Sequence, residues 1–222
     1  MNFLTGLSSL RQQYRESLKE ETLALIDRAL DELTESGIIA GGLQVGDQVP
    51  NFALPNTAEQ IVDLYPLLTR GSVVISFFRG LWCPFCNFEL QGLEQALAAI
   101  QSLEATLVAI SPQNQQYSLA TIEQHKLTFD ILNDRGNQTA RRFGLVYQLP
   151  EYLRPVFEQG GYPLPRYNGD ESFELPIPAT FVVNRNGEII YAFASPDYSQ
   201  RADPIEVITI LRKAMSSSIA TL

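Results

Sequence analysis

The chain has only two cysteines, and both stand in one four-residue window, Cys83-Pro84-Phe85-Cys86. Residues at positions i and i+3 share one face of a helix, so the two sulfur atoms can close a disulfide with little backbone movement. A pair placed in this way within a chain of 222 residues calls for a chemical explanation. We therefore predict reversible cycling between a dithiol and a disulfide at Cys83 and Cys86.

The sequence around the pair predicts a strand that ends shortly before it and a helix that begins at it. Residues 72–78 are nearly all apolar and rich in β-branched and aromatic types, which is typical of a strand buried on both faces. Apolar residues then recur at helical spacing, at Leu90, Leu93, Leu97 and Ile100. Pro84 suits a first helical turn because its missing N–H costs nothing there. We expect a helix over Pro84–Ser102.

The start of a helix is a favourable place for a reactive cysteine. Its unpaired N–H groups and partial positive charge stabilise a thiolate, which lowers the pKa of the thiol. Cys83 lies nearer the open end of the helix and is expected to be the attacking thiolate. Cys86 lies one turn further in and would resolve the mixed disulfide.

Other interpretations of the two cysteines are weaker. They are too few for a disulfide-stapled scaffold, and with a single histidine they cannot complete a Cys/His zinc site within one chain. We accordingly expect no metal and no cofactor. Two inert cysteines packed as small apolar residues remain the alternative to a redox pair.

The elements that follow predict an α/β fold. Thr106–Ser111 is a second short apolar strand, so strand, helix and strand form a unit with a parallel sheet. We expect further elements in the order helix 114–126, strand 129–133, helix 137–143 and a hairpin of 181–184 with 188–193. A closing helix is expected from Asp203-Pro204 to about Ser216, with Ile205, Ile208 and Leu211 facing inward. The stretch 145–178 has no clear period and is expected to be an ordered excursion over the site.

The N-terminal part differs in composition from the rest. Residues 8–36 are charged and carry apolar side chains at helical spacing, which predicts one amphipathic helix ending at Gly37. This helix docks on its own domain or forms a dimer contact. We expect an N-terminal helical extension over residues 1–40 and one domain over residues 41–222.

Charge and hydropathy exclude several partners. The net charge is −9 and no cluster of Lys and Arg is present, so a nucleic-acid surface is not expected. A membrane helix needs about 20 apolar residues, and the longest apolar stretches are far shorter. The first ten residues lack a basic start followed by an apolar run, so we expect no secretory signal and a cytoplasmic location.

Ile177 and Pro178 lead directly into the predicted strand 181–184. In a redox fold, a cis proline before such a strand lies against the disulfide and exposes backbone for an extended partner. An ordinary trans proline at a strand start is the alternative, and cis bonds are only about 5–6% of X–Pro bonds. Both interpretations stay open at this point.

The pair at a strand–helix junction, together with Trp82 and Pro178, resembles the thioredoxin fold. More closely, the chain is similar to the peroxiredoxin-like branch of the alkyl hydroperoxide reductase / thiol-specific antioxidant (AhpC/TSA) family. The likeness covers about residues 42–213 and rests on the stretches 46–55, 77–90, 109–112 and 178–182. It implies a thioredoxin-like α/β fold with a central mixed sheet flanked by helices.

The chain also departs from that family's peroxide-binding motif, P-x-x-x-T-x-x-C. If Cys86 takes the place of the motif's cysteine, Cys83 takes that of the threonine and Arg79 that of the proline. Pro178 stands where the family has an arginine. Aligning Cys83 with the motif's cysteine restores neither residue. Arg79 either supplies a substitute charge beside the site or is an ordinary solvated arginine.

These observations together predict a thiol-dependent oxidoreductase. We place thiol–disulfide exchange first and peroxiredoxin-type reduction of hydroperoxides second, with a non-enzymatic redox sensor third. Cys83 and Cys86 would carry the chemistry, and the residues expected to shape the site are Arg79, Trp82, Pro84, Phe85, Ile177 and Pro178. The expected partners are a disulfide or hydroperoxide substrate and a thiol donor, either a thioredoxin- or glutaredoxin-type protein or a small thiol. A homodimer is left open.

Overall fold

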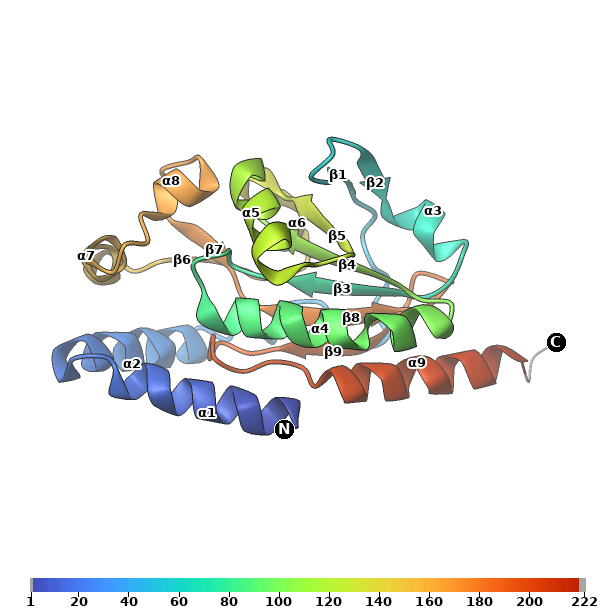
Figure 1. Ribbon diagram of the computed structural model, residues 1–222, viewed down its shortest axis with the longest axis horizontal. Coiled ribbons are helices and arrows are strands. Elements are labelled where there is room, and N and C mark those ends of the chain that lie inside the picture. Colours follow the sequence, from blue (N-terminus) through green and yellow to red (C-terminus); the bar gives the residue numbers. More distant parts are fainter. Residues whose placement is uncertain (1, 220–222) are drawn as a thin grey trace.

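The computed structural model describes residues 2–219, and its centre is a five-stranded mixed sheet in the order β5-β4-β3-β8-β9 (Figure 1). Strands β3, β4 and β5 run parallel to one another, whereas β8 and β9 are antiparallel to their neighbours. The strands are β3 (Val73–Phe77), β4 (Thr106–Ser111), β5 (Asp130–Asn133), β8 (Ala179–Val183) and β9 (Ile189–Ala194). A small separate hairpin pairs β1 (Ala53–Pro55) with β2 (Ile61–Asp63).

Helices cover both faces of this sheet. The helices α4 (Pro84–Ser102) and α9 (Pro204–Ile219) lie on one face and contact each other, and α3 (Leu64–Leu68) and α6 (Gln138–Arg142) pack on the other. All five residues of β3 are buried, which explains why this strand is almost continuously apolar. The α/β architecture expected from the sequence is thereby confirmed.

The predicted order of elements around the redox pair is also confirmed. Helix α4 and strand β4 have the expected bounds, and β3 and β4 are parallel. Helix α5 (Gln115–His125) follows, and β8 and β9 form the expected hairpin. Of the described residues, 2–219, none belongs to a helix long and apolar enough to cross a membrane.

The closing helix α9 differs from the prediction in its buried face and its end. Ile205 was expected to face inward but is 62% exposed, whereas Val207 and Leu211 are fully or nearly buried. Positions i and i+4 form the inward stripe from Val207, and Ile205 falls outside it in the first turn. The helix also continues past Ser216 to Ile219.

The N-terminal segment forms two helices and not the single helix predicted over 8–36. Helix α1 (Phe3–Glu16) and helix α2 (Glu20–Glu35) are separated by a turn at Ser17, whose hydroxyl donates to the carbonyl of Tyr14 at 2.7 Å. Such a local side-chain bond offers the backbone an alternative to continuing the helix. Figure 1 shows the two helices folded back on each other beside α9.

The excursion expected over 145–178 is ordered. Strand β6 (Val146–Gln148) pairs antiparallel with β7 (Glu174–Pro176), and between them lie a short 3₁₀ turn, α7 (Arg154–Gln159) and α8 (Leu164–Asn168). Buried Leu153, Leu164 and Leu175 anchor the segment in the core. It occupies the same end of the molecule as the turn between α1 and α2 (Figure 1).

Candidate active site

Cys83 lies where the chain passes from β3 into α4. It is the N-cap of α4, with an extended backbone (φ −93°, ψ 112°), and its Sγ accepts the N–H of Cys86 at 3.4 Å. Pro84 occupies the first helical turn, as expected. Both cysteines are free thiols and fully buried. The thiol pair is therefore held at the positive end of a helix of 19 residues.

The loop before Cys83 is fixed by a glycine and by two side-chain hydrogen bonds. Gly80 has φ +149°, and a Cβ at this position would lie 2.7 Å from Nε1 of Trp82. Gln113 accepts the N–H of Leu81 at 2.8 Å, and Asn87 donates to the carbonyl of Leu81 at 2.7 Å. The tight loop brings the indole ring of Trp82 close to the helix start.

Arg79 is part of the site and not a solvated arginine. Its exposed fraction is 4%, and its Nη2 donates to Sγ of Cys83 at 3.1 Å. The guanidinium also lies over the rings of Trp82 and Tyr198, 4.8 Å and 4.6 Å from their centroids. Arg79 thus supplies a positive charge directly to the sulfur of Cys83.

A second buried arginine contacts the second cysteine. Nη2 of Arg201 donates to Sγ of Cys86 at 3.1 Å, and its Nε forms an ion pair with Glu89. Glu89 is also buried and accepts a hydrogen bond from Thr180 at 3.1 Å. Each sulfur of the pair therefore has its own guanidinium donor.

These contacts shift the pKa values of the two thiols in opposite directions. Burial alone would raise the pKa of Cys83, but the hydrogen bond with Cys86 and the charges of Arg79 and Arg201 hold it well below its ordinary value. The pKa of Cys86 is raised well above its ordinary value by burial and by the hydrogen bond and charge of Cys83. Of the two thiols, Cys83 is therefore the one that these contacts favour as a thiolate.

The charges of the buried cluster agree with a single thiolate. Two guanidinium groups, on Arg79 and Arg201, accompany one carboxylate, on Glu89. One thiolate at Cys83 makes the four groups neutral together, whereas two neutral thiols would leave a positive charge buried. Uncompensated charge is costly at low dielectric, so the cluster favours ionisation of one cysteine.

An apolar cavity of about 300 Å³ adjoins the site. Arg79, Trp82, Pro84 and Phe85, from the start of α4 and the loop before it, line one part of the cavity. Helices α1 and α2 and the turn between them contribute Tyr14, Leu18, Ile26, Ala29, Leu30 and Leu33. The excursion contributes Tyr147, Leu149, Pro150, Leu153, Val156, Phe157 and Tyr162. The cavity therefore lies between the redox pair, the N-terminal helices and the excursion.

Ile177 and Pro178, also predicted to shape the site, directly precede β8, whose Ala179 pairs with Phe77 of β3. Ile177 packs in the core on the opposite face of the sheet, with Phe77 and Phe181, and its N–H bonds to the carbonyl of Leu145 at 2.7 Å. Pro178 is buried at the start of β8, and no cis peptide bond occurs over residues 2–219, so the bond before Pro178 is trans. The ordinary interpretation of this proline holds in the structure.

Sequence reasoning missed Arg201 and the two tyrosines that contact the site. Rings of Tyr14 and Tyr198 pack edge-on against Phe85, with centroids 5.3 Å and 5.6 Å away. The helical spacing of apolar residues in the N-terminal segment includes Tyr14, but it does not indicate which part of the molecule this side chain contacts. Arg201 stands alone in the sequence and carries no motif.

Solved structures identify the class of fold. Peroxidoxin BcpB from Mycobacterium tuberculosis superposes with a TM-score of 0.61 at 20% identity, over 77% of this chain and 97% of that one. A Chlorobium tepidum structure provisionally described as thiol:disulfide interchange protein DsbE gives 0.56 at 20% identity, over 78% and 99%. The fold is thioredoxin-like, as the resemblance implied.

Sequence comparison narrows the class to one family. The model of the AhpC/TSA family matches residues 45–192, about two thirds of the chain, and the protein belongs to this family. A Haemophilus influenzae protein provisionally named peroxiredoxin bcp is 33% identical over 104 residues, which are 46% of this chain and 66% of that protein. Thiol-disulfide oxidoreductase ResA of Halalkalibacterium halodurans is 22% identical over 171 residues, 76% of this chain and 80% of ResA.

The chain matches just under two thirds of the length of its bacterial bcp relatives. For the Buchnera aphidicola protein of that name, the match is 28% identical over 103 residues and covers 65% of the relative. The helices α1 and α2 and the segment that carries Arg201 all lie outside the family match at 45–192.

Proposed function

We propose that this protein is a thiol-dependent peroxidase that reduces small organic hydroperoxides at Cys83, with Cys86 as the resolving thiol. One observation carries the proposal: a buried arginine donates to the buried sulfur of Cys83, 3.1 Å away, and the same arginine lines an apolar cavity. The same arrangement makes the sulfur nucleophilic and gives an apolar peroxide a place beside it.

The reaction follows from the ordinary chemistry of cysteine. The Cys83 thiolate attacks one peroxide oxygen, the O–O bond breaks, and the sulfur becomes a sulfenic acid while the alkoxide takes up a proton and leaves as an alcohol. Cys86 then attacks the sulfenic sulfur, forming the disulfide and releasing the hydroxyl as water. Two equivalents of a donor thiol reduce the disulfide and are themselves oxidised to a disulfide.

Arg79 supports a peroxide substrate in a second way. Of the described residues, none accepts a hydrogen bond from its buried Nε. We expect a substrate oxygen that enters the site to become the acceptor of this N–H, while Nη2 remains on the sulfur of Cys83. Stabilising the negative charge that develops on the leaving oxygen is the main task in this step.

Burial of the sulfur favours a small substrate. Cys83 has no exposed surface, and Tyr14, Phe85 and Tyr198 pack together beside it. The disulfide of a folded protein could reach Cys83 only after these side chains had moved. We expect a small hydroperoxide to need a smaller movement, because Arg79, Trp82 and Phe85 line the adjoining cavity.

Thiol–disulfide exchange, which the sequence alone placed first, is the second candidate. Two thiols at a helix start, one with a lowered pKa and one with a raised pKa, support it. The similarity to ResA, named a thiol-disulfide oxidoreductase, supports it too. In that case Cys83 would form a mixed disulfide and Cys86 would resolve it.

Stopped-flow mixing of the reduced protein with cumene hydroperoxide tests the proposal. The chain has a single tryptophan, Trp82, beside the site, and its fluorescence reports on Cys83. We expect fast, peroxide-dependent oxidation in the native protein and in Cys86→Ser, and none in Cys83→Ser. Oxidation no faster than that of a free thiol, together with rapid reaction with a small disulfide, would overturn the peroxidase in favour of exchange.

The partners follow from the same geometry and remain predictions. A small thiol fits the buried disulfide better than a thioredoxin- or glutaredoxin-type donor, which would require movement of the helices α1 and α2. The division at residue 40, the homodimer and the cytoplasmic location also remain predictions.

A further inference from the structure

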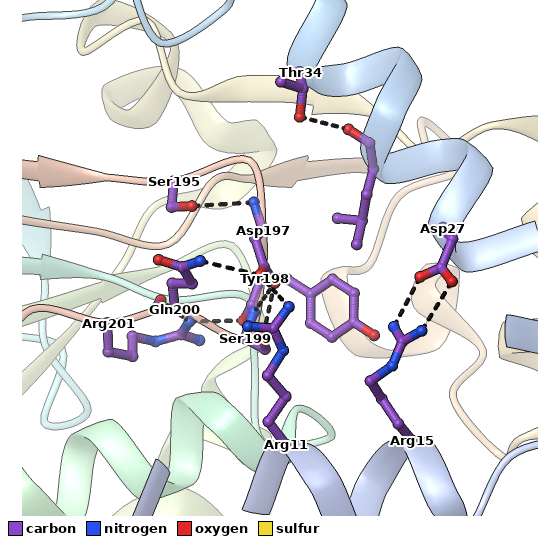
Figure 2. A network of polar contacts seen from close by, with 11 residues as sticks. Arg11, Arg15, Asp27, Thr34, Ser195, Asp197, Tyr198, Ser199, Gln200 and Arg201 are labelled. Carbon is purple, nitrogen blue, oxygen red and sulfur yellow. Dashed lines mark hydrogen bonds and ion pairs between the residues drawn. The ribbon is translucent and has the colours of Figure 1, made fainter. Parts of the chain in front are cut away.

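Arg201 is held by two parts of the molecule, its own segment before α9 and helix α4. Nη1 donates to the carbonyls of Tyr198 and Gln200 at 2.7 Å and 2.6 Å, and Nε pairs with the carboxylate of Glu89. Figure 2 shows the side chain of Arg201 beside Tyr198 and Gln200, whose carbonyls it bonds. With Nη1 and Nε so anchored, the plane of the guanidinium is fixed and Nη2 is directed at Sγ of Cys86.

We propose that Arg201 is a positioning residue for the resolving step: it orients the Cys86 thiol toward Cys83 and becomes the counter-ion of the Cys86 thiolate once Cys83 is oxidised. The proposal rests on the proposed function, because it assigns a role within the second step of that reaction. Arg201 lies outside the matched residues 45–192, so it is not one of the groups that define the family.

Orientation follows from what each group can donate. The sulfur of Cys86 accepts from Arg201, which leaves its S–H to point at the thiolate of Cys83. Without the guanidinium, the thiol could rotate away from its target. The contact therefore places the proton and the sulfur of Cys86 where both are needed.

The charge balance shows why a second guanidinium is useful. When Cys83 attacks the peroxide, its negative charge passes to the alkoxide, which can take the proton of Cys86 and leave as an alcohol. Cys86 is then the thiolate, and the buried cluster of Arg79, Arg201 and Glu89 stays neutral with its one thiolate. The negative charge has moved from the sulfur beside Arg79 to the sulfur beside Arg201.

The bond changes balance. The Cys86 thiolate attacks the sulfenic sulfur of Cys83, the S–S bond forms and the S–O bond breaks. Hydroxide leaves and takes a proton from solvent to become water. Cys83 and Cys86 have together lost two electrons, and the hydroperoxide has gained them.

Ionisation of Cys86 depends on several groups around it. The ionisable groups that act on it come from α4, from the loop before α4, from β6 and from the segment before α9: Cys83, Glu89, Arg79, Tyr147 and Arg201. Arg201 is the one of these that both carries a positive charge and hydrogen-bonds to the sulfur of Cys86.

Single-turnover kinetics of three variants test the role. Reduced protein is mixed with cumene hydroperoxide, and the peroxide-dependent first phase is separated from the peroxide-independent second phase by the fluorescence of Trp82. Arg201→Gln removes the charge, and Arg201→Lys keeps it. Arg11→Gln is the matched control. Arg11, in α1, pairs at 3.0 Å with Asp197, which belongs to the same segment as Arg201, and it has no contact with the cysteines among those described.

In Arg201→Gln we expect a second phase slowed at least about tenfold and trapping of the sulfenic acid by dimedone. The pH profile of that phase should move to higher pH. Arg201→Lys should retain the native pH profile even if its maximal rate falls. If Arg201→Gln does not fold, the pH profile of Arg201→Lys tests the role by itself. Arg11→Gln should behave as the native protein. An unchanged second phase in Arg201→Gln, or a pH profile in Arg201→Lys that shifts, overturns the role.

Failure of the proposed function is separately visible. If the native protein shows no peroxide-dependent first phase, the peroxidase is wrong. The same variants are then compared for release of thionitrobenzoate from the mixed disulfide that Cys83 forms with dithionitrobenzoate, a step that Cys86 performs without peroxide. A release rate that Arg201→Gln leaves unchanged overturns the role of Arg201 in that case too.

Discussion

The part of the chain inside the AhpC/TSA match and the part outside it contribute different things to one site. Helix α4 and the loop that joins it to β3, inside residues 45–192, provide both cysteines together with Arg79 and Glu89. The helices α1 and α2 and the segment after β9, outside it, provide a wall of the cavity, the ring of Tyr198 and the guanidinium of Arg201. The family region thus supplies the reactive pair and part of the cavity wall, and the regions outside it complete the cavity and provide the guanidinium beside Cys86.

The two arginines show this division most directly. Arg79 lies four residues before Cys83 in the sequence, whereas Arg201 lies 115 residues after Cys86. The first guanidinium comes with the helix start, and the second depends on how the end of the chain folds back. Changes inside the family region should therefore affect the attack on substrate, and changes outside it should affect selectivity, resolution or stability.

The largest effect is expected inside the family region, at Cys83 itself. Cys83→Ser should abolish turnover with hydroperoxide, whereas Cys86→Ser should still react once. Intact-mass spectrometry after one equivalent of hydroperoxide checks this. The native protein should lose two hydrogens, and Cys86→Ser should gain an oxygen. Oxidation of Cys83→Ser at Cys86 with native speed would reverse the assignment.

Arg79→Gln should have the next largest effect. Loss of a charged donor to the reacting atoms lowers the rate constant by about 100-fold to 1,000-fold in comparable sites. The second-order rate constant with cumene hydroperoxide measures the effect. Arg70→Gln, at an exposed arginine, is the matched control. A loss of less than a few-fold in Arg79→Gln would mean that the helix start alone activates the thiol.

Filling the cavity from outside the family region should change selectivity more than activity. Leu30→Trp, in α2, should slow the reaction with cumene hydroperoxide by about tenfold while leaving that with hydrogen peroxide nearly unchanged. Leu4→Trp in α1 is the control, because Leu4 is 47% exposed and away from the cavity. Equal slowing with both peroxides would show that the cavity does not bind the organic part of the hydroperoxide.

The smallest effect is expected at the contact between the two N-terminal helices. Arg15 bonds to Asp27 at 2.8 Å and 2.9 Å, and this hydrogen bond holds the pKa of Asp27 below its ordinary value (Figure 2). Because the pair is half-exposed, Arg15→Gln should lower the free energy of unfolding by only about 0.5 kcal/mol.

The pH dependence of that loss has a definite sign. A carboxyl whose pKa is lowered by folding stabilises the fold above its unfolded pKa and loses this contribution as the pH falls through its folded pKa. Urea unfolding at neutral pH should therefore separate Arg15→Gln from the native protein, and unfolding in acid should not. A difference that persists in acid would point to packing and not to charge.

Local patterns allowed most of the family region to be predicted. The strand 72–78, the helix Pro84–Ser102 and the parallel pairing to Thr106–Ser111 follow from apolar runs and spacing within about forty residues, and β3, α4 and β4 match them. The position of Cys83 at the helix start followed from the same patterns. These features depend on neighbours in sequence, which is why the sequence alone sufficed.

Features that depend on distant contacts were not predictable. The periodicity of residues 8–36 is compatible with one helix, and the break at Ser17 is stabilised by contacts between α1 and α2 that no local pattern announces. The prediction of the buried face of α9 was wrong at Ile205, because this apolar side chain lies in solvent. Arg201 gave no signal because its partners, Cys86 and Glu89, are more than a hundred residues away.

The pH dependence of Cys83 alkylation by iodoacetamide shows directly whether Arg79 stabilises a thiolate at Cys83. In the native protein, the rate should stay near its maximum well below pH 8.5, the approximate pKa of an ordinary cysteine. In Arg79→Gln, the profile should move toward that ordinary value. A native profile centred near the pKa of a free cysteine, and unchanged in Arg79→Gln, would contradict the account.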